Sequence, residues 1–318
     1  MIHFDEKIEF SNVANDVLTV GELLVDMISD GYDSEKESKD YHAFFGGSPA
    51  NIAMNIKRLG AQSTIASAVG KDRFGNFLLN HLIEAGIGTH LIQQVEQSTS
   101  LVVVTKSTST PIPIFYRGAD YHLKYSDILE QKIIDSKIVH FSCWPASSMP
   151  VRTTLEQVIQ TARQHNCLIC FDPNYHPAIW QHNEDGISYV KHLISQSDIV
   201  KPSEDDANRL FGEASYEEQL ENFLQLGAKL VVMTLGKDGA IVSNGVETIR
   251  FDTMATEVVD TTGAGDAFWS GFYTALVKGC TVKQGLKLGF AVSAYKLRYV
   301  GAVVDLPNLE VVQQMFEL

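Results

Sequence analysis

The sharpest local signal in this chain of 318 residues is the stretch Asp260-Thr261-Thr262-Gly263-Ala264-Gly265-Asp266-Ala267-Phe268. Its glycine-rich turn opens a predicted helix with apolar residues at positions 268, 272, 275 and 276, and Gly279 is placed to end it. Free N–H groups at the start of such a helix can bind an anion, and glycine lets a phosphate approach the backbone. Asp266 lies in the same turn, where the helix dipole favours its ionised form, so it can accept a proton from a hydroxyl. The stretch therefore predicts an anion site beside a general base.

Two common nucleotide-binding motifs do not fit this chain. Gly263 and Gly265 begin a G-x-G-x-x-G pattern, but the sixth position is Phe268. Asp266 would also repel a dinucleotide pyrophosphate at that turn. The P-loop pattern G-x-x-x-x-G-K followed by Ser or Thr occurs nowhere in the sequence. We therefore exclude a dinucleotide-binding turn and a P-loop enzyme.

A second glycine motif, Gly46-Gly47-Ser48-Pro49-Ala50-Asn51, precedes another predicted helix. Ser48 suits the N-cap, Pro49 the first helical position and Gly60 the end of that helix. Asn51 can offer both a donor and an acceptor to a polyol. Capping does not explain the paired glycines, which indicate close approach of the backbone to a ligand. By itself the motif is compatible with a structural turn or with a binding site.

Short apolar runs that lead into a glycine and then into a helical pattern recur along the chain. Such runs end at Gly21, Gly70 and Gly236, and further buried strands are predicted around 139–141 and 168–171. Between them apolar residues recur at helical spacing, as at positions 155, 158, 159 and 162. Strands that alternate with helices predict a mainly parallel sheet covered on both faces, which is a doubly wound α/β fold.

Two stretches interrupt this alternation. Residues 29–40 are polar and mixed in charge, and residues 98–123 hold a β-branched run, a Pro111-Ile112-Pro113 turn and an aromatic pair before Arg117. We expect segments 24–45 and 98–123 to form a small β-sheet lid outside the main sheet. The sequence shows no repeat and no linker, so we expect one domain that spans residues 1–318.

The formal net charge of -14 restricts the function classes. A surplus of acidic residues argues against broad contact with nucleic acid or anionic membrane, because both favour clustered Lys and Arg. A polyanionic substrate would need backbone amides, a few placed cations and a metal ion. The chain has four cysteines, no apolar run long enough to span a membrane and no secretory signal, which together predict a cytoplasmic protein.

The two glycine motifs, in this order and at this separation, resemble the two signatures of the ribokinase/PfkB family of carbohydrate kinases. The resemblance extends from Val17 to Pro307. Further matches are Gly21 with Asp26, Asp172-Pro173-Asn174, Lys201-Pro202-Ser203, Thr234-Leu235-Gly236 and Gly301-Ala302. The resemblance implies a ribokinase-like fold with its site at the carboxyl ends of the strands, between sheet and lid. It also implies transfer of the terminal phosphate of ATP, with Mg²⁺, to a hydroxyl of a small sugar.

The resemblance also implies roles for individual residues. Asp266 matches the catalytic base, and the amides of Gly263, Ala264 and Gly265 match the anion hole. The positions that match sugar-binding residues are Asp26, Gly46, Gly47, Asn51, Arg117 and Asn174. The positions that match nucleotide-binding residues are Lys201, Ser203, Thr234, Gly236 and Gly239. Asp206 matches a residue that organises Mg²⁺ through water, and Asp260 with Thr262 matches a K⁺ site of some members.

The chain departs from the family pattern at several positions. Ser203 and Asp206 replace the Asn and Glu of an Asn-x-x-Glu element that helps to organise magnesium and phosphates. Ribokinases have Lys and Asn at the positions of Ser48 and Leu24. This difference argues against ribose as the substrate. The stretch that begins at Gly21, together with the Gly-Gly-Ser-Pro-Ala-Asn motif, is most similar to bacterial fructokinases.

A sugar acid is the main rival substrate. The 2-keto-3-deoxygluconate kinases share an arginine like Arg117, but where they have a second arginine this chain has His176. A neutral histidine cannot make the bidentate contact of arginine to a carboxylate, so a neutral sugar, and fructose in particular, is favoured. The alternatives are a nucleoside kinase and a non-catalytic sugar-binding regulator. The lid is also a candidate surface for a homodimer.

Overall fold

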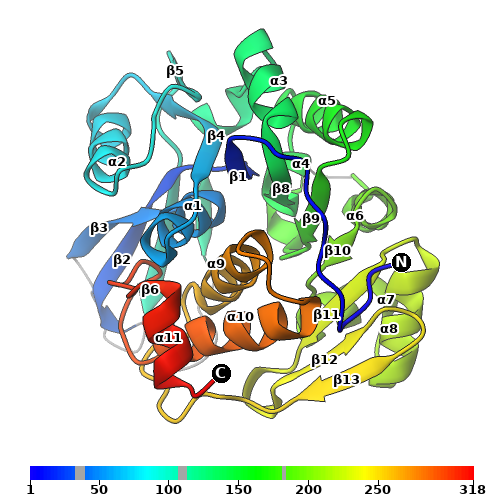
Figure 1. Cartoon of the computed structure of the whole chain (residues 1–318). Coiled ribbons are helices and arrows are strands. Elements are labelled where there is room, and N and C mark those ends of the chain that lie inside the picture. The colour runs from blue at the N-terminus through cyan, green and yellow to red at the C-terminus, as the bar shows by residue number, and fades with distance from the viewer. Residues whose placement is uncertain (33–39, 107–112, 181–183) are drawn as a thin grey trace.

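The computed structural model describes residues 1–32, 40–106, 113–180 and 184–318 (Figure 1). Within these residues a main sheet of nine strands forms the centre of the molecule. In order across the sheet the strands are β13 (Thr248–Phe251), β12 (Ala240–Ser243), β11 (Leu230–Thr234), β10 (Ile199–Val200), β9 (Leu168–Asp172), β8 (Ser136–Ser142), β1 (Asn15–Val20), β4 (Ser63–Gly70) and β5 (Ile92–Val95). All pairs from β5 to β11 are parallel, and β12 runs antiparallel to both of its neighbours. The predicted mainly parallel α/β sheet is confirmed.

Helices alternate with these strands along the chain. They are α1 (Ser48–Leu59), α2 (Arg73–Glu84), α3 (Asp127–Ile134), α4 (Cys143–Ala146), α5 (Val151–Gln164), α6 (Gly186–Ser195), α7 (Glu204–Phe211), α8 (Tyr216–Gln225), α9 (Ala264–Val277), α10 (Val282–Lys296) and α11 (Leu309–Met315). Three short 3₁₀ turns complete the set: η1 (Ala119–His122), η2 (Pro177–Ile179) and η3 (Gly236–Asp238). In the described chain, no helix combines the length and the apolar character that crossing a bilayer requires.

Both faces of the main sheet are covered, because its strands carry apolar side chains on both sides. On β1, Leu18 and Val20 belong to the core under α5, α6 and α8, whereas Val17 belongs to the core under α1, α9 and α10. All three side chains are fully buried. In Figure 1 helices α1, α9 and α10 lie on one side of β8 and β9, and α5 and α6 lie on the other. Continuous burial of this kind is typical of parallel strands between two helical layers.

A second, smaller sheet lies beside the main one. Its order is β3 (Tyr41–Gly46), β2 (Leu24–Tyr32), β6 (Leu101–Lys106) and β7 (Ile114–Tyr116). The two interrupting stretches of the sequence thus pair with each other through β2 and β6, which run parallel. The predicted small β-sheet is confirmed, while residues 33–39 and 107–112, which include part of the predicted Pro111-Ile112-Pro113 turn, lie outside the described residues.

Helix α9 is buried on every side, whereas the sequence predicted burial of a single apolar face. Its residues from Ala267 to Leu276 are all buried, because α1 packs on one side and α10 on the other. Close approach of α10 depends on small residues: a Cβ on Gly271 would lie 2.7 Å from Val292 Cγ2. This packing fixes the first turn of α9 next to the carboxyl ends of β9 and β10, where Asp172 and Lys201 lie.

Candidate active site

The carboxylate of Asp266 lies where the first turns of α1 and α9 meet. The Ser48 hydroxyl donates to Asp266 Oδ1 over 2.6 Å, and Asn51 Nδ2 donates to Oδ2 over 2.9 Å. Asn51 and Asp266 are separated by 215 residues in the chain. The two glycine motifs that the sequence singled out therefore meet around one carboxylate.

Ser48 is not the N-cap that the sequence predicts. Gly47 takes the N-cap position with φ 109°, and Ser48 is the first residue of α1. As the first helical residue Ser48 lies past the capping position, and its hydroxyl donates to Asp266. A Cβ on Gly47 would lie 2.5 Å from the carbonyl oxygen of Glu22, so this position requires glycine both for its φ and for space.

Burial raises the pKa of the Asp266 carboxyl above its ordinary value. Hydrogen bonds from Ser48 and Asn51 oppose this effect, since they stabilise the ionised form. Desolvation by burial is the largest of these effects, so the net direction is upward. A raised pKa brings this carboxylate closer to the range in which a general base works near neutral pH.

The backbone of Gly263, Ala264 and Gly265 forms the turn that begins α9. Gly263 is the N-cap with φ 73°, and a Cβ there would lie 2.7 Å from Ala302 Cα. The Ala264 N–H donates to the Thr261 carbonyl over 3.1 Å, so this amide of the predicted anion hole is engaged in the turn itself. The turn is thus held against the segment that carries Ala302.

An ammonium group stands beside this turn. A Cβ on Gly265 would lie 3.3 Å from Lys201 Nζ, so glycine keeps this space open for the cation. Lys201 Nζ lies 3.0 Å from Asp172 Oδ2, which also accepts from Trp269 Nε1 over 2.8 Å. The adjacent parallel strands β9 and β10 deliver Asp172 and Lys201 to the same edge of the sheet. A positioned cation next to a helix N-terminus is a suitable place for a phosphate.

A cavity of about 380 Å³ opens next to Lys201 and the turn before α9. Six residues predicted from the sequence line it: Lys201, Thr234, Gly236, Gly239, Ala264 and Gly265. Sequence reasoning missed the apolar part of its wall, which includes Met254, Ala255, Val258, Phe290 and Leu297. These residues come from a loop, from α10 and from its C-cap Leu297, and they carry no motif, so only the tertiary structure assembles them.

Four of the predicted sugar-binding residues gather around Asp266. Asp26 lies on β2 opposite β3, and a Cβ on Gly46 would lie 2.3 Å from Asp26 Oδ2. Burial, and then the charge of Asp266, raise the pKa of Asp26 to about 7. Gly47 follows Gly46 directly, and Asn51 lies in the first turn of α1, so the lid strand β3 leads straight into the site.

Glu22 is a residue of this region that sequence reasoning missed. Its side chain is 5% exposed, and its Oε2 has no hydrogen-bond partner in the described structure. Burial, with smaller contributions from Asp120 and Asp266, raises the pKa of Glu22 to about 8. A carboxylate directly after the strand-ending Gly21 was the signal that could have identified it.

Arg117, predicted to bind substrate, directly follows the lid strand β7 and contacts the segment after α4. Its guanidinium pairs with Asp120 and donates to the hydroxyls of Ser147 and Ser148 over 2.6 and 3.1 Å. Its charged group also lies 4.7 Å from the ring centre of Trp144. A substrate that binds Arg117 would therefore share the guanidinium N–H groups with Asp120, Ser147 and Ser148.

Asn174 and His176 lie at the end of β9, on the side of the lid. Asn174 is exposed, with φ 35°, and so is accessible to a ligand. His176 accepts from the Ala178 N–H and packs edge-on against Phe115 of the lid. Burial, and then the charge of Arg209, lower the pKa of His176, so it is neutral near pH 7.

Asp206 and Ser203 form a capping box at the start of α7. The Asp206 carboxylate accepts from the N–H and the hydroxyl of Ser203 and from the N–H of Tyr175. In the described residues no group of three or more His, Cys, Asp or Glu side chains could hold a metal ion. Asp206 is thus occupied in structural contacts, and its role toward Mg²⁺ stays a prediction.

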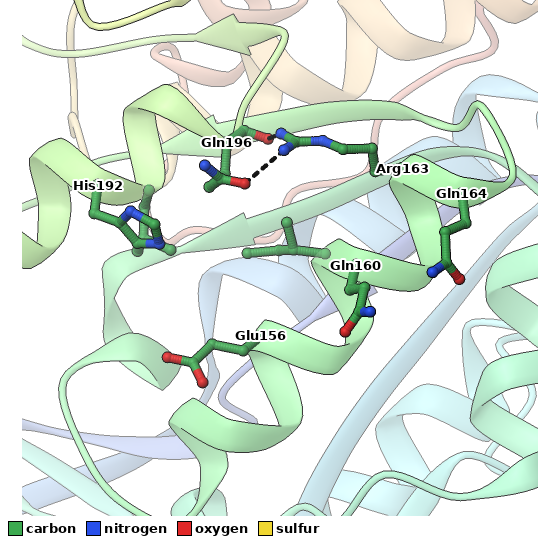
Figure 2. A pocket seen from close by; sticks show the side chains of 8 residues that line it. Glu156, Gln160, Arg163, Gln164, His192 and Gln196 are labelled. Atoms are coloured by element: carbon green, nitrogen blue, oxygen red, sulfur yellow. Dashed lines mark hydrogen bonds between the residues drawn. The ribbon is translucent and has the colours of Figure 1, made fainter.

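A second hollow, separate from the cavity beside Lys201, lies between α5 and α6 (Figure 2). Its volume is about 340 Å³, and polar side chains surround it, among them Glu156, Gln160 and His192. Arg163 donates to both Gln196 Oε1 and the Gln196 carbonyl across it. None of the residues predicted from the sequence to form the site lines this hollow.

The family model described as pfkB family carbohydrate kinase matches residues 14–309. The chain belongs to the pfkB family of carbohydrate kinases. Membership in this pfkB family confirms the resemblance drawn from the two glycine motifs, and it makes the protein a sugar phosphotransferase.

Individual pfkB relatives align over almost the whole chain. An ATP-dependent 6-phosphofructokinase of Thermoanaerobacterium thermosaccharolyticum is 59% identical over 318 residues, which is 100% of this chain and 99% of the relative. A solved fructokinase structure from Halothermothrix orenii has a TM-score of 0.77 and 44% identity, over 86% of this chain and 97% of that one. A double-mutant fructokinase of Vibrio cholerae O395, with fructose, ADP and potassium bound, has a TM-score of 0.82 and 27% identity, over 96% and 99%.

Replacing Ser48 by alanine should shift the acidic limb of the pH–activity profile to higher pH. Ser48 lowers the pKa of Asp266 by donating to it, so its loss raises that pKa further. A general base works in its ionised form, and the rate therefore falls as pH falls through its pKa. The measurement is kcat/KM from about pH 5 to 9, with the exposed Ser188→Ala on α6 as the control. An unmoved limb in a folded Ser48→Ala variant would contradict this role.

Replacing Glu22 by glutamine should remove a dependence of stability on pH. The carboxyl titrates near its ordinary pKa of 4.5 when unfolded and at about 8 when folded. Between these values the folded state holds the extra proton, so the wild type loses stability as pH rises from about 4.5 to about 8. The advantage of Glu22→Gln should therefore be about 2–4 kcal/mol larger at pH 8 than at pH 4.5.

Urea unfolding at the two pH values measures this difference. The control is Glu217→Gln, which changes an exposed carboxylate on α8. An equal effect of Glu22→Gln at both pH values would show that the folded protein does not hold Glu22 in its protonated form.

Proposed function

We propose that this protein is an ATP-dependent ketose kinase that phosphorylates a hydroxyl of a fructose-type sugar. The observation that carries the proposal is the Asp266 carboxylate, which Ser48 and Asn51 hold at the start of α9. On one side of it lie Asp26 and the Gly46-Gly47 turn, and on the other lies the cavity lined by Lys201 and Gly265. The position suits a base that acts between a sugar and a nucleotide.

The cavity beside Lys201 suits ATP. Its apolar wall can take the adenine ring, and Lys201 and the turn of residues 263–265 lie at the end where phosphates would bind. Thr234, Gly236 and Gly239 border the same cavity. Mg²⁺ bound together with ATP neutralises phosphate charge. Since the described residues offer no acidic cluster for a metal, the phosphates themselves would hold it, with Asp206 in reach only through water.

In the proposed reaction the sugar hydroxyl attacks the terminal phosphorus of ATP. The new bond joins the sugar oxygen to that phosphorus, the bond to the bridging oxygen of ADP breaks, and the hydroxyl proton passes to Asp266. The amides of Gly263 and Gly265 and the Lys201 ammonium would stabilise charge on the transferred group, whereas the Ala264 amide is engaged within the turn. Closure of the lid over the sugar would exclude water as a competing acceptor.

The relatives support a fructose unit as the acceptor but differ at its sixth carbon. The 59% identical relative is named a 6-phosphofructokinase, and the 44% identical structure is a fructokinase. The higher identity supports fructose 6-phosphate ahead of the free fructose that the sequence analysis favours. A phosphate on the sugar calls for a cation, and Arg117, which also pairs with Asp120, is the arginine at this side of the site.

The geometry around His176 supports a sugar without a carboxylate. His176 is uncharged near neutral pH and uses Nδ1 to cap η2, so it offers a sugar acid no cation.

We further propose one domain, a cytoplasmic location and a homodimer through the lid. The exposed apolar side chains of Phe44, Ile114 and Tyr116 on the lid support the last of these.

A coupled assay of ADP release with MgATP tests the substrate. The acceptors are fructose 6-phosphate, fructose, 2-keto-3-deoxygluconate, ribose and adenosine. We expect kcat/KM for the best fructose acceptor to exceed that for the other three classes by at least about 10²-fold. Preferred turnover of the keto acid, ribose or adenosine would refute the fructose proposal while leaving the kinase class intact.

Replacing Asp266 by asparagine should reduce kcat by about 10²–10⁴-fold, because the amide cannot accept the hydroxyl proton. Asparagine has nearly the same shape, so the fold should be kept, which circular dichroism and the melting temperature would verify. ATP binding, measured by calorimetry, should change much less than kcat. Near-normal turnover in a folded variant would remove Asp266 from the proposed role.

A further inference from the structure

A lysine ammonium lies buried at the loop for which the family resemblance implies a K⁺ site. Lys296 is fully buried at the carboxyl end of α10, and its Nζ donates to the Asp260 carbonyl oxygen over 2.7 Å. The same Nζ lies 3.9 Å from Asp260 Oδ2. The Lys296 side chain therefore already places a positive charge at Asp260.

The Asp260 carboxylate also accepts three hydrogen bonds from the polypeptide. Asp260 Oδ1 accepts from the N–H and the hydroxyl of Thr262 over 2.9 and 2.8 Å. Asp260 Oδ2 accepts from the Gly301 N–H over 2.7 Å. A metal ion bound to Asp260 and Thr262 would have to compete with these hydrogen bonds and with the charge of the ammonium. The residues present thus do not fit the K⁺ site that the resemblance implies.

The position of Lys296 connects it to the turn before α9. The Val259 N–H donates to the Leu297 carbonyl over 2.8 Å, and the Gly263 position packs against Ala302. The loop of residues 259–263 is therefore clamped onto the segment of residues 297–302, with the Lys296 ammonium between them. Loss of the charge would loosen the turn that leads into Gly263, Ala264 and Gly265.

We propose that Lys296 supplies a built-in monovalent cation that orders the loop of residues 259–263, so that this protein needs no K⁺. The inference rests on the proposed function only in naming residues 263–265 as the anion hole. An alkylammonium head and K⁺ carry the same charge and are similar in size, so one can replace the other among carbonyl and carboxylate oxygens. The lysine acts as a positioning residue, since it touches the loop and not the reacting atoms.

The wild-type protein provides the first test. Its melting temperature and, with the best acceptor, its kcat are measured in KCl, NaCl and choline chloride at equal ionic strength. We expect kcat to vary by less than about twofold among the salts and the melting temperature to be the same in all three. A rise of about tenfold in kcat, or a specific rise in melting temperature, with K⁺ would overturn the proposal.

Two variants at the same position provide the second test. Lys296→Ala opens a space that K⁺ can enter, so K⁺ should raise its melting temperature by about 2–5 °C over choline and restore part of its lost kcat. Lys296→Met removes the charge but fills the space, so K⁺ should help it little. The exposed Lys287→Ala on the same helix is the control and should behave as the wild type.

The outcomes separate this inference from the proposed function. If no acceptor is phosphorylated, the melting temperatures still decide whether K⁺ has a site. A folded Lys296→Ala variant with full kcat in choline, or without any response to K⁺, would overturn the role of the lysine. If Lys296→Ala does not fold, the salt dependence of the wild type alone decides whether the protein needs K⁺.

Discussion

The arrangement of this protein depends on the contact between the Asp266 carboxylate and the donors Ser48 and Asn51. It joins the start of α1, which follows the lid strand β3, to the start of the buried helix α9. A carboxylate at this depth is costly unless it is hydrogen-bonded, so the two helix starts must keep their positions. The same contact that orders the lid side against the main sheet therefore also holds the proposed base.

Acidic groups surround this contact, and burial governs their behaviour. Glu22, Asp26 and Asp266 are close enough for their charges to interact, and burial raises the pKa of each. The buried cations of the region are each held by a carboxylate, in the pairs Arg117–Asp120, Lys201–Asp172 and Lys296–Asp260. Each of these three cations near the proposed site is thus paired with a carboxylate.

Local patterns in the sequence predicted much of the fold. Apolar runs before Gly21, Gly70 and Gly236 marked strands of the main sheet, and the two irregular stretches marked the lid. Strands and turns of this kind can be predicted because they depend on short apolar runs and on glycines that are adjacent in the sequence. Side-chain partners are different: Ser48 was predicted to cap its own helix, yet it bonds a carboxylate 218 residues away.

Sequence patterns alone were enough to predict the mainly parallel α/β fold, the pfkB family and the two glycine turns of the site. The surroundings of the charged groups became visible only in the folded chain. Burial in the folded chain raises the pKa of Glu22 and of Asp266, and the fold pairs Arg117 with Asp120 and Lys296 with Asp260. The physical reason is that desolvation and charge pairing depend on neighbours distant in the chain, whereas turns and strands depend on adjacent residues.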